Sequence, residues 1–125
     1  MAKGRRCGKG SGVSTIKRVG DREFFSDHVE FNGVVGQRGV TAYARGQSIK
    51  GQTEDCLRQI DAFLVAAGAD ETEFLTSTVH LSDMKDKGGM NEVWGAWLDP
   101  AHKATRPTVQ TPLGTSNTLI EIVVE

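Results

Sequence analysis

The stretch TLIEIVVE at residues 118–125 is the clearest strand signal in the sequence. Apolar residues fill every second position from Ile120 to Val124, and a period of two is that of a β-strand with one buried face. Glu121 then shares the opposite face with Leu119 and Val123. A carboxylate among apolar neighbours is unfavourable unless it is paired with another group or serves a function. Glu121 is therefore a candidate functional residue.

A second extended segment precedes this strand and begins beside an arginine. It reads ATRPTVQTPL at residues 104–113, is rich in Thr and Val, and is followed by turn residues up to position 117. Two strands joined by such a turn can bring Arg106 and Glu121 to the same end of a sheet. From the residues alone, two interpretations stay open: a ligand site, or an ion pair across a subunit interface.

Composition limits the possible classes of function. The 125 residues suffice for one domain, and 15 basic against 16 acidic side chains give a net charge of -1. This balance argues against a nucleic acid or an anionic membrane as the main partner. No apolar run is as long as a membrane span, and no signal peptide is visible.

Cysteines and histidines give no sign of a metal or redox site. Cys7 and Cys56 form no ligand spacing, and the three histidines are scattered singly. We therefore predict a reduced, cytoplasmic protein without a metal site. Residues 1–12 are basic and Gly-rich, which predicts a leader that is mobile, held from outside its own domain, or left over from cloning. The folded domain is expected over residues 13–125.

The remaining periodicity predicts an α+β fold. Extended segments are expected at residues 15–19, 24–31, 34–44 and 73–82, with a type I′ turn at Asn32-Gly33. Apolar residues spaced three and four apart predict helices over 48–67, ended by Gly68, and over 89–98. These elements predict a single mixed sheet of the six-stranded type, with two helices covering one of its faces. Because the other face stays bare and partly apolar, we expect self-association.

Taken together, these segments resemble the Rid (reactive intermediate deaminase, or YjgF) family over nearly all of residues 14–125. Each piece alone is weakly specific, but the combination is specific. The resemblance rests on NGVV at 32–35, GQT at 51–53, QIDAFL at 59–64, AG at 67–68, MNEVWGAW at 90–97, and Arg106 fifteen residues before Glu121.

This resemblance implies a homotrimer with a barrel-like core and three clefts between subunits. In deaminating members an arginine binds the carboxylate of a 2-imino or 2-enamino acid, and a glutamate positions water, without metal or cofactor. Arg106 and Glu121 match those two residues. Asn91 matches an asparagine that lines the cleft.

The sequence also departs from the family pattern. Arg38-Gly39 stands where deaminating members commonly carry a serine before the glycine, and Phe25 replaces a cleft tyrosine. Pro107 and Pro112 each remove a backbone donor. If Arg38 lies near Arg106, two guanidinium groups would suit a dicarboxylic substrate. The alternative is that Arg38 faces solvent or pairs with an acidic neighbour.

Three functions are therefore compared. The first is a metal-independent enamine/imine deaminase that releases a 2-oxo acid and ammonia. The second is a non-catalytic, ligand-binding or regulatory trimer. The third, RNA cleavage with inhibition of translation, is disfavoured by the balanced charge and by the lack of an aromatic stacking platform or a histidine pair.

Overall fold

The computed structural model describes residues 15–44, 47–69, 73 and 75–125. The predicted leader at residues 1–12, with Cys7, lies outside the described residues. The chain divides into two compact units, the first ending at Arg38 and the second running from Gly39 to Glu125. In the described part, neither helix is long and apolar enough to cross a membrane.

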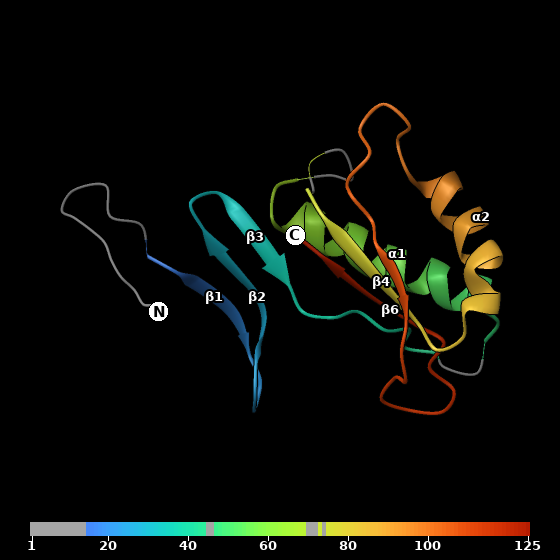
Figure 1. The fold of residues 1–125 in the computed structure, drawn as a ribbon. Helices are drawn as coiled ribbons and strands as arrows, with labels where there is room; N and C mark the ends of the chain where they lie inside the picture. Colours follow the sequence, from blue (N-terminus) through green and yellow to red (C-terminus); the bar gives the residue numbers. More distant parts are fainter. Residues whose placement is uncertain (1–14, 45–46, 70–72, 74) are drawn as a thin grey trace. The chain divides into compact units, whose positions relative to one another are not determined.

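The first unit is an antiparallel sheet of three strands in the order β1-β2-β3 (Figure 1). Its strands are β1 (Lys17–Asp21), β2 (Ser26–Phe31) and β3 (Val34–Gln37). Asn32 and Gly33 join β2 to β3 with φ angles of 52° and 78°. Two positive φ angles in a two-residue loop are those of a type I′ turn, so the predicted hairpin is confirmed.

The second unit packs two helices on one face of another three-stranded sheet (Figure 1). Strand β4 (Ser77–Leu81) is central, with β5 (Thr108–Gln110) parallel to it on one side and β6 (Ile120–Val124) antiparallel on the other. The helices are α1 (Ile49–Ala66) and α2 (Lys87–Trp97), and a 3₁₀ turn η1 (Met84–Asp86) leads into α2. The α+β class is therefore confirmed.

The core of the second unit lies between the helices and this sheet. Ile120, Ile122 and Val124 are fully buried and pack with residues of both helices, whereas Leu119, Glu121 and Val123 are half-buried on the other face. The strand alternation predicted for residues 118–125 is thus confirmed. Fully buried residues of the core include Ile60, Val79, Leu81 and Met90.

A single six-stranded sheet is not confirmed, because the structure has two sheets of three strands. The segment after β3 was expected to continue as a strand, but only Val40 pairs, in one bridge with Ile122. The backbone N–H groups of Tyr43 and Ala44 donate to the buried carboxylate of Asp55 on α1 (3.0 and 3.3 Å). A side chain therefore satisfies backbone groups that a further strand would have used.

Helix α1 begins and ends where its sequence signals lie. The Ser48 hydroxyl accepts from the Gly51 N–H (3.2 Å), and Gly68 follows the helix with a φ of 78°. Within α1, the fully buried Gln52 donates to the Asn117 carbonyl and accepts from the Leu119 N–H, both at 2.9 Å. Gln52 thereby fixes the turn that leads into β6.

Candidate functional site

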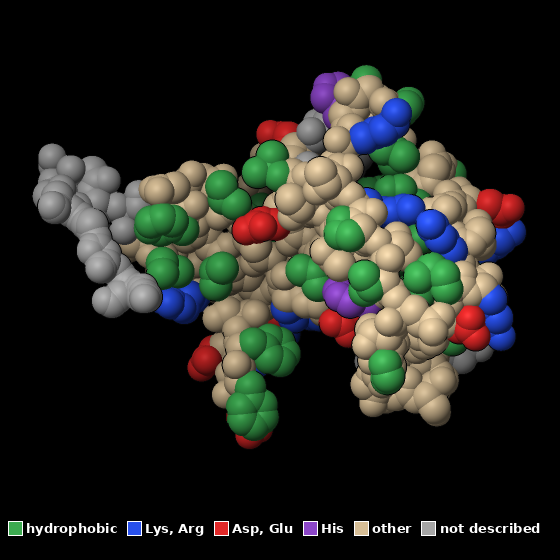
Figure 2. Space-filling view, viewed as in Figure 1, with side chains coloured by type: hydrophobic (Ala, Val, Ile, Leu, Met, Phe, Trp, Pro, Cys, Tyr) green, Lys and Arg blue, Asp and Glu red, His purple; other side chains and the backbone are tan. Residues whose placement is uncertain are grey.

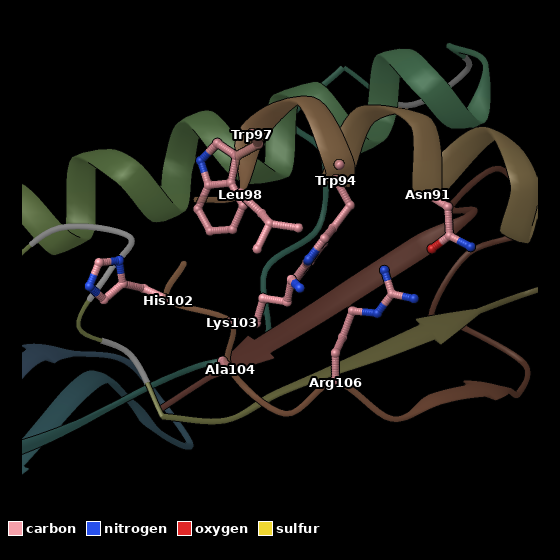
Figure 3. Close-up of a pocket in the computed structure, with 9 residues that line it drawn as sticks. Asn91, Trp94, Trp97, Leu98, His102, Lys103, Ala104 and Arg106 are labelled. Carbon is pink, nitrogen blue, oxygen red and sulfur yellow. The ribbon is translucent and has the colours of Figure 1, made fainter. Parts of the chain in front are cut away.

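A pocket of about 260 Å³ lies between α2 and the segment that connects α2 to β5 (Figure 3). This volume is at the small end for ligand sites, so the pocket suits a small molecule. Its apolar part is formed by the two tryptophans of α2 and by small or aliphatic neighbours, namely Trp94, Gly95, Trp97, Leu98 and Ala104. Its polar part is formed by Asn91, His102, Lys103 and Arg106, and no acidic residue lines it.

Arg106 is held in this pocket from both sides. Hydrogen bonds from Ser77 N–H to the Thr105 carbonyl and from Val79 N–H to the Pro107 carbonyl, both 2.9 Å, fix its backbone to β4. Pro107 therefore joins the sheet through its carbonyl although it has no N–H to donate. The backbone on both sides of Arg106 thus stays paired with β4 although Pro107 has no donor.

The guanidinium of Arg106 rests on apolar groups. Its Cζ lies 5.1 Å from the centroid of the Trp94 ring, within range for a cation–π interaction, and Nη1 lies 3.4 Å from Sδ of Met90. Burial lowers the pKa of Arg106, but a guanidinium stays charged near neutral pH. Among the described residues, no carboxylate pairs with it. This cation is therefore available to an anionic ligand.

Asn91, Lys103 and His102 share the pocket with Arg106 (Figure 3). Asn91 was predicted as a cleft residue, and the structure brings it to the same pocket as Arg106. Lys103 and His102 were not predicted. His102 contacts Asp99 through Nδ1 at 3.1 Å, and the Ala101 N–H, followed by His102, holds the pKa of Asp99 below its usual range.

Glu121 and Gly39 meet elsewhere on the second unit. Glu121 pairs with His80 in the β4–β6 ladder and lies on the face that the helices leave uncovered. A Cβ atom built on Gly39 would overlap Oε2 of Glu121, so glycine at position 39 leaves the space that the carboxylate fills. Gly39 thus positions Glu121 by having no side chain.

Arg106 and Glu121 belong to the same sheet but to opposite faces. Thr108 is the β4 partner of Val79, which faces the helices, and Arg106 two residues earlier contacts Trp94 and Met90 on that same side. Glu121 lies on the other side, as its place in β6 requires. Within one copy of the chain the two groups therefore do not form one site.

The other two predicted site residues, Phe25 and Arg38, belong to the first unit. Phe25 is exposed. Nε of Arg38 contacts Oδ1 of Asp27 at 3.1 Å, and Arg22 binds both oxygens of that carboxylate at 2.9 Å. Arg22 and, after it, Arg38 hold the pKa of Asp27 below its usual range. Of the two roles considered for Arg38, the structure favours pairing with an acidic neighbour.

The described residues contain no group of His, Cys, Asp and Glu that could hold a metal ion. Burial raises the pKa of the Cys56 thiol to about 12, and its Sγ donates to the Val40 carbonyl (3.5 Å). A thiol with so high a pKa is a packing group rather than a nucleophile.

These features define a small α+β protein with an arginine in a largely apolar pocket. The family model described as Endoribonuclease L-PSP matches residues 15–125. The chain therefore belongs to this family, which is also known as the YjgF or Rid family. The resemblance seen in the sequence is thus confirmed.

Three similar proteins agree on the family, and one of them is named for a function. The RutC family protein YoaB of Escherichia coli K12 is 33% identical over 108 residues, which are 86% of this chain and 94% of that protein. Reactive Intermediate Deaminase A, chloroplastic, of Arabidopsis thaliana is 32% identical over 94 residues, 75% of this chain and 50% of that protein. A crystal structure of NMB1025, a YjgF family member from Neisseria meningitidis, has a TM-score of 0.84 and 31% identity, covering 88% of this chain and 92% of that one.

Proposed function

We propose that this protein is a metal-independent enamine/imine deaminase that hydrolyses 2-imino or 2-enamino acids to 2-oxo acids and ammonia. The observation that carries the proposal is Arg106, a cation without a carboxylate partner among the described residues, on the apolar surface of Trp94 and Met90. The family includes a protein named as a deaminase, which supports the same chemistry.

Arg106 is suited to bind the carboxylate of such a substrate. A guanidinium grips a carboxylate through two parallel hydrogen bonds, and its charge does not depend on pH in the neutral range. The apolar surroundings strengthen this pair relative to one in water. Asn91, in the same pocket, adds an amide donor and acceptor for the imine nitrogen or the water.

The reaction itself needs orientation more than a strong base. Water adds to the carbon of the protonated C=N bond and gives a carbinolamine, and the C–N bond then breaks as a proton moves from oxygen to nitrogen. A carboxylate that holds the water and shuttles this proton fulfils the requirement. Glu121, half-buried against Gly39, is the residue that we assign to this step.

The site that we propose is shared between copies of the chain. Arg106 and Glu121 face opposite sides of one sheet, so a guanidinium from one copy and a carboxylate from the next are needed to make one cleft. The half-buried apolar residues beside Glu121, Leu119 and Val123, provide a surface for that association. We propose that this assembly is the homotrimer that the family resemblance implies.

An ammonia-release assay tests the proposal. Imino acids are generated in situ by an amino-acid oxidase, and their decay is followed with wild type, Arg106→Ala and Arg58→Ala. Arg58 is an exposed arginine of α1 outside the pocket, so its variant is the matched control. Loss of a charged hydrogen-bond donor costs about 1.5–3 kcal/mol, so we expect kcat/KM of Arg106→Ala to fall roughly 10- to 100-fold.

Two outcomes would contradict the proposal. Wild-type protein that accelerates the decay of no imino acid would rule out the deaminase. If it still bound 2-oxo acids through Arg106, a ligand-binding module would be the better description. Equal kcat/KM for wild type and Arg106→Ala would leave the deaminase but remove Arg106 from it.

A further inference from the structure

We infer that the pocket takes a ligand with two acidic groups, so that the preferred substrate is a 2-imino or 2-enamino dicarboxylic acid. The inference rests on the proposed function and names the substrate class for the same site. Its basis is a second cation, Lys103, that lines the pocket together with Arg106.

The charges in the pocket are unbalanced. Arg106 and Lys103 both line it, no Asp or Glu does, and among the described residues neither cation pairs with a carboxylate. Two cations beside an apolar wall repel each other in a medium that screens poorly. Within one copy, Lys103 is thus a second cation with which an acid group of the ligand can pair, while the Glu121 carboxylate of the next copy is assigned to the water.

The two cationic side chains end at different places in the view of Figure 3. The guanidinium of Arg106 lies on the Asn91 side of the pocket, and Lys103 reaches toward Trp94 from the segment after α2. The third basic group, His102, already contacts the Asp99 carboxylate at 3.1 Å. Arg106 is therefore assigned to the carboxylate next to the imine, and Lys103 to the acid group at the end of the side chain.

The pocket also restricts what joins the two acid groups. Trp94, Trp97 and Leu98 form an apolar wall, which suits a short carbon chain. A volume of about 260 Å³ within one copy is enough for a compact metabolite. The ligand class is thus a short dicarboxylic acid. In the sequence analysis the second cation was Arg38, but the structure pairs Arg38 with Asp27. Lys103 takes the role of the second cation instead.

Binding of stable 2-oxo acids tests the inference without depending on turnover. The dissociation constants of 2-oxobutyrate and 2-oxoglutarate are measured by calorimetry at one ionic strength for wild type, Lys103→Met and Lys85→Met. Lys85 is 76% exposed and outside the pocket, which makes it the matched control. We expect wild type and Lys85→Met to bind the dicarboxylate roughly tenfold more tightly, and Lys103→Met to lose this preference while 2-oxobutyrate affinity changes less than about twofold.

The outcomes separate this inference from the proposed function. Equal affinities for the two acids in wild type, or a Lys103→Met variant that keeps the preference, would overturn the dicarboxylate assignment even if monocarboxylic imines are hydrolysed. A Lys103-dependent preference in a protein that releases no ammonia would uphold the ligand class and overturn the deaminase.

Discussion

Gly39 is the residue on which the position of Glu121 most directly depends. Its φ is not positive, so an alanine causes no backbone strain, but the added Cβ would overlap Oε2 of Glu121. We therefore expect Gly39→Ala to displace the carboxylate and to lower kcat of imine hydrolysis roughly tenfold or more, because small misplacements of a catalytic group are costly.

Gly88→Ala is the matched control for this prediction. Gly88 lies in the first turn of α2, where an added Cβ meets nothing within 4 Å. Alanine there is expected to leave kcat unchanged and to raise the melting temperature slightly, since alanine favours a helix over glycine. An unchanged kcat in Gly39→Ala, with a melting temperature like that of wild type, would show that Glu121 is not placed by Gly39.

At the scale of single residues, the sequence predicted what local rules decide. The face of Glu121 follows from a period of two, and the turn at Asn32-Gly33 follows from which residues tolerate positive φ. Lys103 was missed because its direction depends on how the segment after α2 packs. Its place three residues before Arg106 was the available signal, but sequence spacing in an irregular segment does not tell where a side chain points.

Among the elements, the junction between α1 and β6 depends most on one buried side chain. The amide of Gln52 donates to the carbonyls of Gln47 and Asn117 and accepts from the N–H of Leu119. Gln52→Ala leaves these backbone groups without a partner in a buried place, so we expect the free energy of unfolding to fall by about 3 kcal/mol.

Urea denaturation of Gln52→Ala beside Glu54→Ala measures this effect. Glu54 is exposed on the same helix, and its removal is expected to change the stability by less than about 0.5 kcal/mol. A Gln52→Ala variant as stable as the control would mean that water or another side chain replaces the lost bonds.

The elements themselves were predicted well where one periodicity runs without interruption. The helix expected over residues 48–67 is observed at Ile49–Ala66. The helix expected to begin at residue 89 begins at Lys87, because a 3₁₀ turn that Asp83 caps through the Lys85 N–H (2.9 Å) leads into it. The strand expected after Val40 does not form, because the N–H groups of Tyr43 and Ala44 donate to Asp55 of α1. This contact joins residues far apart in the sequence, and local patterns do not reveal it.

At the scale of the whole molecule, the two faces of the β5-β4-β6 sheet carry different side chains. One face packs against both helices and carries Arg106, whereas the other carries Glu121 between apolar residues and is not covered by a helix (Figure 1). Figure 2 shows hydrophobic side chains on the surface in several places, and the exposed ones include Phe24, Val109 and Leu75. A chain with this much apolar surface is suited to assembly with copies of itself.

A shared site makes a quantitative prediction about mixed assemblies. Arg106→Ala and Glu121→Gln are each expected to have low activity alone, about one tenth of that of wild type or less, since every cleft would lack one group. When the two chains are co-expressed with different tags and mixed assemblies are isolated, some clefts combine the arginine of one variant with the glutamate of the other. A mixed trimer, whichever variant is in the majority, has one complete cleft among its three, so we expect about one third of the wild-type activity per cleft.

The control for this experiment mixes Arg106→Ala with Arg106→Gln, a pair in which no cleft can regain a guanidinium. Recovery in the first mixture and none in the second would place the two groups on neighbouring copies. Mixed assemblies of the first pair that stay inactive would mean that Arg106 and Glu121 do not act in one cleft. Because the two side chains lie on opposite faces of one sheet, the loss of activity in Glu121→Gln would then have to come from a changed packing of β6 and not from a missing step beside Arg106.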